Sequence, residues 1–359
     1  MYESAAAERY VGALVREIED WNEIEIPTEV DTIYFGGGTP SLINPTQLER
    51  ILSTVARRFD VTSEAEITLE INPGDGGASP SARLQTMREW RRLGINRASF
   101  GAQTFSDREL KLLGRTHDSN DITATFHQLR EAGFANINFD LIAGLPGQTL
   151  ERWRSNLARA LELKPEHLSL YLLDVHECTP LADQIARGMR PSQDEDLTAQ
   201  MYSEMVEIVC DAGYQHYEIS NFCLPGFESR HNSKYWSGAP YYGFGNSAHS
   251  FDGVWRRWAN VRDQAAYVTS IEHNQSPVTE RTNLTEADAR SESVFLGMRL
   301  MRGINLDDYR QRFRSDLLSE NNGECARLIE TGLIEIDGQY LRLTTRGALL
   351  SNEVFAVLA

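Results

Sequence analysis

The sequence predicts an α/β protein whose first half is a domain of parallel strands, in a barrel or a sheet, followed by a mixed α+β region and a winged-helix-like C-terminal module. Two observations lead to this fold class. Short apolar runs alternate with amphipathic stretches, and five strand candidates are centred near residues 33, 69, 98, 138 and 169. Their spacing is typical of βαβ units, which take about 30 or more residues each. We expect three domains, at residues 1–177, 178–283 and 284–359.

The first half begins with a helix at residues 8–21, where apolar side chains recur at helical spacing. A strand at 30–35 stops at three glycines, Gly36 to Gly38, and residues 46–59 again show helical periodicity. The same pattern of a strand followed by a helix recurs, and a last strand closes the series. The predicted strands are 66–74, 95–105 and 135–147, and the helices that follow them are 81–94, a stretch up to 133, and 149–163. The last strand is 166–175.

Beyond residue 178 the regular alternation stops. Residues 193–212 predict a helix, and the aromatic, glycine-rich stretch 214–258 is irregular apart from one alternating piece at 214–222. The last part of the chain predicts helices at 286–301, 306–313 and 324–332, a hairpin at 333–344 and a closing helix. This order of elements is winged-helix-like.

The composition excludes several classes of protein. The chain has 359 residues, with 52 acidic and 35 basic side chains, and its formal net charge of −17 repels nucleic acid and anionic lipid. The winged-helix-like module is also acidic, so a nucleic-acid-binding function is disfavoured. No apolar run reaches the length of a spanning helix, and the start lacks the features of a signal peptide. We therefore expect a cytoplasmic protein with reduced thiols and no Walker loop.

Polar residues follow most of the predicted strands. Parallel strands bring their carboxyl ends to one edge, where ligands of such folds bind. We therefore expect a polar pocket for a zwitterionic or nucleoside ligand there. Pro40 fits the first turn of a helix after the glycine turn. The residues at these strand ends are Gly36 to Thr39, Glu70, Gln103 with Arg115, Asp140 and Asp174.

Several segments carry a resemblance to a known family. YFGGGTPSL, EITLEINPG, INRASFGAQTF, LKLLGRTH, FDLIAGLPGQT and HLSLYLL resemble radical S-adenosylmethionine (SAM) proteins of the oxygen-independent coproporphyrinogen oxidase superfamily. AGYQHYEISNF, SRHNSKYW and GFGNSAHSF resemble the HemW haem chaperone branch, with HNxxYW as its most specific signature. The resemblance spans nearly the whole chain. It implies a partial (β/α)6 radical-SAM-type barrel that lacks its first strand.

The resemblance also implies roles for individual residues. SAM would be held by Gly37, Gly38, Thr39, Glu70, Gln103, Arg115 and Asp140, in agreement with the strand-end pocket. In HNxxYW, His231 would ligate haem iron, and Asn232, Tyr235 and Trp236 would shape a wall against the porphyrin. The residues alone favour a structural role for a lone histidine among aromatic rings. No residue is assigned a catalytic role.

The family's 4Fe–4S cluster is held by a CxxxCxxC loop, which would stand just upstream of Glu8. The four cysteines, Cys178, Cys210, Cys223 and Cys325, do not have that spacing, so no cluster ligand is assigned in this sequence. We expect that the sequence begins downstream of that loop; the alternative is a relative without a cluster.

The function implied by the resemblance is that of a haem chaperone. It would bind haem and deliver it to apo-haemoproteins or to haem acceptors of the respiratory chain. The resemblance is compatible with a homodimer and with peripheral membrane association through the recipient alone. The main alternative is an enzyme, an oxygen-independent coproporphyrinogen III oxidase.

A further motif, GFGNSA at 243–248, fits the GxGxxA form of the dinucleotide fingerprint. The following residues do not read as a helix, so a Rossmann loop is disfavoured. We expect instead a tight turn packed near HNxxYW.

Overall fold

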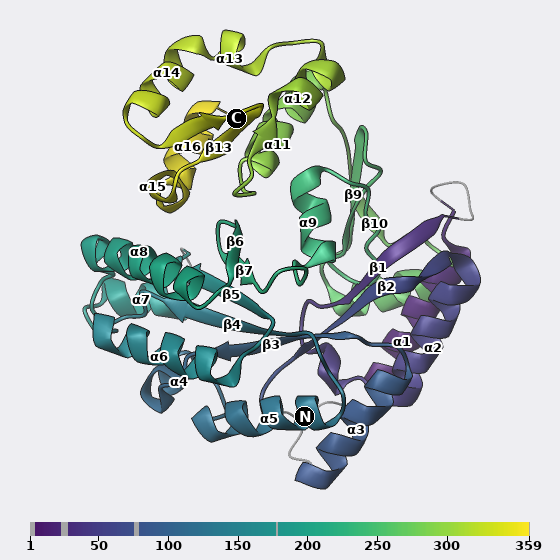
Figure 1. Ribbon diagram of the computed structural model, residues 1–359. Helices are drawn as coiled ribbons and strands as arrows, with labels where there is room; N and C mark the ends of the chain where they lie inside the picture. The colour runs from purple at the N-terminus through teal and green to yellow at the C-terminus, as the bar shows by residue number, and fades with distance from the viewer. Residues whose placement is uncertain (1–3, 23–27, 75–78, 177–178, 359) are drawn as a thin grey trace.

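The computed structural model describes residues 4–22, 28–74, 79–176 and 179–358 (Figure 1). Its main sheet has the strand order β1-β2-β3-β4-β5-β7-β6. The first five strands pair in parallel, which confirms the five strands predicted from sequence. The last two pair antiparallel and extend the same sheet. The strands are β1 (Glu29–Phe35), β2 (Asp60–Ile71), β3 (Arg97–Gln103), β4 (Ile137–Ala143), β5 (His167–Leu172), β6 (Gln215–Glu218) and β7 (Asn221–Cys223).

Helices cover the outer face of this curled sheet (Figure 1). Helices α2 to α6 lie between consecutive parallel strands, as βαβ units require, whereas α1 precedes β1, and α7 and α8 follow β5. The helices are α1 (Ser4–Asp20), α2 (Pro45–Arg58), α3 (Pro80–Arg92), α4 (Asp107–Leu112), α5 (Ser119–Glu131), α6 (Leu150–Leu163), α7 (Pro180–Ala186) and α8 (Glu195–Asp211). The expectation that Pro40 starts such a helix is wrong. Pro40 opens the 3₁₀ turn η1 (Pro40–Leu42), and α2 begins later, because Asn44 provides its capping box.

The sheet is buried on both faces at its centre. All seven residues of β3 are buried, and the core beneath the helices contains Phe100, Phe139 and Trp153. A polar residue of β4 has its partners within the sheet: the side chain of Asn138 contacts Ser99 at 3.0 Å and His167 at 2.6 Å. Burial on both faces is usual for parallel strands, because the connecting helices cover them.

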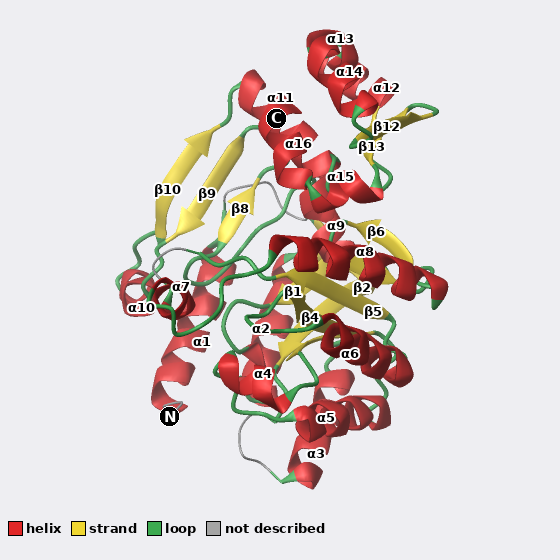
Figure 2. Ribbon diagram, turned by 90° about the vertical axis from the view of Figure 1, so that its left-hand side faces the viewer, coloured by secondary structure: helices red, strands yellow, loops and turns green. Residues whose placement is uncertain are grey.

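The region after α8 is built from short elements. A second antiparallel sheet stands beside the main one and leads into the C-terminal module (Figure 2). The elements here are α9 (Arg230–Ser237), β8 (His249–Phe251), β9 (Arg256–Asn260), α10 (Gln264–Glu272) and β10 (Val278–Asn283). The alternating piece at 214–222 forms β6 and β7, whereas α9 was not predicted. This eight-residue helix carries HNxxYW and starts at Ser229, whose hydroxyl accepts from the Asn232 N–H.

The C-terminal module has the predicted order of helices and a hairpin. Its sheet has the order β11-β13-β12. The helix predicted at 286–301 ends at Gly297, because the chain turns into β11 soon after. The elements are α11 (Glu286–Gly297), β11 (Ile304–Asn305), α12 (Leu306–Phe313), α13 (Leu317–Glu320), α14 (Asn322–Glu330), β12 (Ile334–Asp337), β13 (Tyr340–Leu343), α15 (Thr345–Leu349) and α16 (Ser351–Leu358).

Two further expectations from sequence concern the first domain boundary and membrane-spanning helices. The boundary proposed between residues 177 and 178 lies outside the described residues and stays a prediction, although β6 and β7 join the sheet of the first region. Within the described part of the chain, no helix is both long enough and apolar enough to cross a membrane.

The packing of α6 against α8 gives a test of the fold. Trp153 on α6 is fully buried, and its indole N–H donates to the Met201 carbonyl at 3.1 Å. Trp153→Ala should lower the free energy of unfolding in urea by about 3–5 kcal/mol, because it opens a cavity and removes this bond. Trp255 is 43% exposed, so Trp255→Ala should change the free energy of unfolding by less than about 0.5 kcal/mol. Equal losses in both variants would contradict the packing described.

Candidate functional site

The predicted strand-end residues gather around one cavity. Its volume is about 300 Å³, and it lies at the carboxyl-end side of the parallel strands β1 to β4. Six of the seven residues expected to contact SAM line it, and the seventh, Gly37, donates its backbone N–H to Glu70 Oε2 at 3.2 Å. The lining residues are Gly38, Thr39, Pro40, Glu70, Ile71, Asn72, Ser99, Gly101, Gln103, Arg115 and Asp140.

The turn after β1 needs glycine for two reasons: lack of space for a Cβ at Gly36, and positive φ angles at Gly37 and Gly38. A Cβ at Gly36 would stand 2.5 Å from Tyr34 Cε1 and 2.8 Å from Glu70 Oε1, so only glycine fits there. Gly37 and Gly38 have φ of +74° and +126°, which L-residues rarely adopt. A Cβ at either would meet nothing within 4 Å, so their backbone borders open space. A ligand can therefore approach the backbone closely at this turn.

Glu70 is held in place from two sides. The Tyr34 hydroxyl donates to Glu70 Oε1 at 2.8 Å, and the Gly37 N–H reaches the other oxygen. Burial, and then the nearby Glu70 charge, raise the pKa of Tyr34 well above its usual value. Tyr34 therefore stays a neutral donor, which keeps the Glu70 carboxylate fixed at the cavity edge.

Asp140 is the most strongly perturbed carboxylate of the cavity. Burial raises its pKa to about 6, although the Asn138 side-chain N–H, which donates to it at 2.8 Å, and the nearby Arg97 charge favour the ionised form. Perturbed carboxylates in clefts are typical of functional sites.

Gln103 and Arg115 complete the polar lining. Gln103 is a non-glycine residue at φ +63°, a strained conformation of the kind found at binding sites. A Cβ at Gly101 would come within 2.8 Å of the Gln103 side-chain nitrogen, so Gly101 leaves room for it. Arg115 donates to Asn72 Oδ1 at 3.5 Å, and Asn72 donates to Thr39 Oγ1 at 3.4 Å.

One strand-end residue was placed wrongly, and others were missed. Asp174 does not line the cavity, because β5 ends at Leu172 and the Asp174 side chain is 79% exposed. Ser99 and Gly101 line it but were not predicted. Their two-residue spacing to Gln103 on one face of β3 was the signal that could have identified them.

His231 of HNxxYW lies on the inner side of β1, next to Tyr34. The two rings stack with centroids 5.0 Å apart and an interplanar angle of 24°. Its Nδ1 is 3.0 Å from Thr32 Oγ1, and its Nε2 is 3.1 Å from the Tyr235 hydroxyl. Burial, followed by the Lys234 and Arg97 charges, lowers the pKa of His231 to about 4. The imidazole is therefore neutral at physiological pH, the form that binds a metal.

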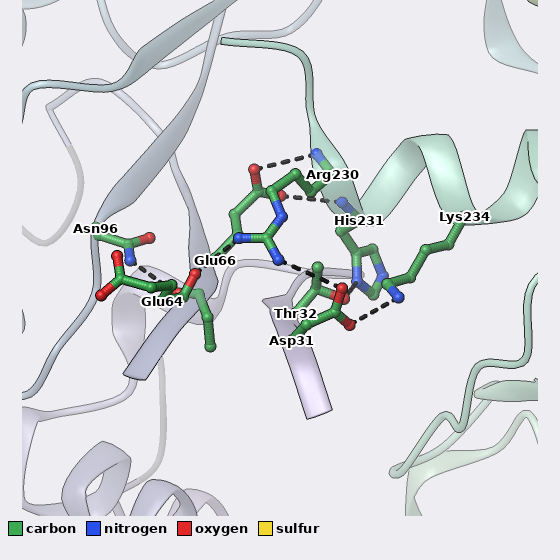
Figure 3. Close-up of polar contacts among 9 residues, drawn as sticks. Asp31, Thr32, Glu64, Glu66, Asn96, Arg230, His231 and Lys234 are labelled. Carbon is green, nitrogen blue, oxygen red and sulfur yellow. Dashed lines mark hydrogen bonds and ion pairs between the residues drawn. The ribbon is translucent and has the colours of Figure 1, made fainter. Parts of the chain in front are cut away.

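The start of α9 is fixed to the sheet by a buried carboxylate (Figure 3). Glu66 on β2 is 6% exposed and accepts the backbone N–H groups of Arg230 at 3.1 Å and His231 at 3.0 Å. A carboxylate at a helix N-terminus is favoured by the helix dipole and by the free N–H groups there. Asp31 on β1 adds ion pairs with Lys234 at 2.7 Å and Arg230 at 3.3 Å.

The four motif residues do not surround a single cavity. His231 and Tyr235 are in contact, and Asn232 contributes its backbone N–H to the cap of α9. Trp236 instead lines a separate cavity of about 310 Å³, bordered by α11 and α12, with the Arg299 guanidinium 4.4 Å from its ring centroid. The aromatic wall expected from sequence is thus divided between two places.

GFGNSA does not have a Rossmann context, because the residues after it form β8. The prediction of a turn is confirmed, but it packs on α1 rather than near α9. Gly245 donates its N–H to Glu17 Oε2 at 2.8 Å, and its carbonyl accepts from Asn260 at 2.9 Å.

The three cysteines that the structure describes form no cluster site. Cys210, Cys223 and Cys325 are free thiols, and Cys178 lies outside the described residues. Over the part of the chain that the structure describes, no three His, Cys, Asp or Glu side chains are grouped so as to hold a metal ion.

Two family models match the chain, the radical SAM superfamily over residues 4–160 and the HemN C-terminal domain over residues 284–350. A protein of Lactococcus lactis named heme chaperone HemW is 35% identical over 96% of this chain and 88% of its own length. A Bacillus subtilis protein of the same name is 34% identical over 98% of this chain and 92% of its own length. The chain belongs to the HemW family.

Relatives outside bacteria and a solved structure extend this result. The mouse protein named radical S-adenosyl methionine domain-containing protein 1, mitochondrial, is 32% identical over 92% of this HemW-family chain and 75% of its own length. Coproporphyrinogen III oxidase of Escherichia coli superposes with a TM-score of 0.83 and covers 100% of this chain and 84% of its own. At 24% identity this likeness shows the fold, a curled half-barrel with a C-terminal domain, as predicted.

The Glu66 contact predicts a stability effect. Glu66→Gln keeps the shape of the side chain but replaces one acceptor oxygen by an amide that cannot accept a backbone N–H. The free energy of unfolding in urea should fall by about 1–3 kcal/mol, because a buried donor loses its partner. Glu64, whose side chain is exposed, gives the control: Glu64→Gln should have little effect. If Glu66→Gln were as stable as wild type, Glu66 would not anchor α9.

Proposed function

We propose that this protein is a haem chaperone that binds haem and delivers it to apo-haemoproteins. Membership of the HemW family supports this proposal, because relatives similar over nearly their whole length carry that name. The observation on which it rests in this chain is His231, a neutral imidazole held among Tyr34, Thr32 and Tyr235. Imidazole is a common axial ligand of haem iron, and flat aromatic rings suit a flat macrocycle.

We propose further that the strand-end cavity binds SAM. The cavity fits the chemistry of that ligand: Arg115 would bind the methionyl carboxylate, and Glu70 with Asp140 would favour its amine and sulfonium charges. Thr39, Gln103 and the glycine turn provide further polar groups and close access to the backbone. In the superfamily, SAM bound to a 4Fe–4S cluster supplies radical chemistry. No residue of this sequence is assigned to such a cluster, and no step is derived through one.

The two proposed sites are neighbours. Tyr34 donates to Glu70 at the edge of the SAM cavity while its ring stacks on His231. SAM would thus bind close to the haem ligand and, in a chaperone, take a supporting role.

Haem binding tests the proposed function. Titration of the protein with ferric haem should give a shifted Soret band at one equivalent, and His231→Ala should abolish that shift because the ligand is lost. His249 is exposed on β8, so His249→Ala should bind haem as wild type does. Spectra of His231→Ala identical to wild type would remove His231 as the ligand, and no haem binding by wild type would refute the chaperone function.

The pKa of Asp140 predicts a pH dependence of SAM binding. The carboxyl group titrates near pH 6 without ligand, and a cationic ligand favours its ionised form. Affinity should therefore rise with pH, by up to about tenfold between pH 5 and pH 7. Isothermal titration calorimetry of Asp140→Asn should show this dependence lost, whereas Asp174→Asn should retain it. The same pH profile in Asp140→Asn and wild type would contradict the assignment.

A further inference from the structure

Both ring nitrogens of His231 are engaged by hydroxyl groups. Thr32 Oγ1 lies 3.0 Å from Nδ1, and the Tyr235 hydroxyl lies 3.1 Å from Nε2. Tyr34 covers one face of the ring. The imidazole has no spare lone pair for iron while both hydroxyls stay in place.

The two nitrogens are not equivalent for haem. A porphyrin plane reaches Nε2 more easily, because Nδ1 lies beside Cβ and the helix backbone. A ligating histidine usually donates its other N–H to a fixed acceptor, which sets the tautomer and the ring orientation. Thr32 on β1 provides such an acceptor for Nδ1–H. In this tautomer the lone pair is on Nε2, and the Tyr235 O–H donates to it.

Tyr235 can leave this position without unfolding α9. It lies one turn after His231 on the same helix, so the contact is local and does not anchor the helix to the sheet. The anchors are Glu66 and Asp31. A phenol ordinarily keeps its proton at neutral pH, so the Tyr235 hydroxyl, 3.1 Å from His231 Nε2, is available as a hydrogen-bond donor.

We propose that Tyr235 is a reversible cap on the iron ligand, which competes with haem iron for His231 Nε2, while Thr32 retains the Nδ1 proton. This inference rests on the proposed haem-chaperone function and deepens it. Loading replaces the O–H···N hydrogen bond by an N–Fe bond, and release reverses this exchange with no change of redox state. A cap of this kind lowers the affinity for haem. After haem has left, it gives the Nε2 atom of His231 a hydrogen-bond partner again.

Removal of the phenol hydroxyl tests the cap. Tyr235→Phe keeps the ring, including its edge contact with Tyr241 at a centroid distance of 4.6 Å. It should bind ferric haem about 3- to 10-fold more tightly, with the Soret position of wild type, because one competing hydrogen bond is lost. Transfer to apomyoglobin should slow by a similar factor. Tyr241→Phe, which removes a neighbouring hydroxyl that accepts from Arg257, is the matched control and should leave affinity unchanged.

Thr32 gives a second, independent variant. Thr32→Val removes the acceptor for Nδ1–H and should weaken haem binding by about tenfold, whereas Thr32→Ser should restore it. If wild type binds haem through His231 but Tyr235→Phe binds it no more tightly, the cap is refuted and the chaperone function stands. A weaker complex with a displaced Soret band in Tyr235→Phe would refute the cap too, because Tyr235 would then contact the haem. Loss of haem binding in wild type would refute the proposed function itself.

Discussion

The side chain of Tyr34 joins the two parts of the candidate site. Its hydroxyl donates to Glu70 at the mouth of the strand-end cavity, and its ring stacks on His231. Gly36 makes this possible, because any Cβ there would collide with both Tyr34 and Glu70. The position of His231 depends in turn on Glu66, which fixes the start of α9 against β2. The strand-end cavity and His231 are therefore joined through Tyr34 inside the half-barrel.

The carboxylates of the candidate site are each hydrogen-bonded by neighbouring groups. The buried Glu66 and the partly buried Glu70 and Asp140 each have donors: Glu66 two backbone N–H groups, Glu70 a phenol and a backbone N–H, and Asp140 an amide. Burial shifts the pKa of Asp140 upward to about 6 and that of His231 downward to about 4, so at neutral pH Asp140 is mainly ionised and His231 is neutral. A neutral imidazole near an ionised Asp140 is the chemistry that the proposed haem and SAM sites require.

Much of the cavity could be predicted because it follows from local pattern and topology. Strand periodicity located β1 to β5, and parallel strands necessarily bring their carboxyl ends together, so Thr39, Glu70, Gln103, Arg115 and Asp140 meet. The prediction was wrong for Asp174, since β5 ends before it and the chain turns outward. Helix α9 was missed, because eight residues with few apolar side chains carry too weak a periodic signal.

The sequence by itself determined the α/β class, the polar strand ends and the special backbone of the glycine turn, because these depend on residues close together in the chain. Only the tertiary structure decided what surrounds His231. Thr32 lies 199 residues away and Glu66 lies 165 residues away, and no local pattern encodes such pairings. The packing of α9 onto β1 and β2 brings them together, so that the Thr32 hydroxyl contacts the imidazole.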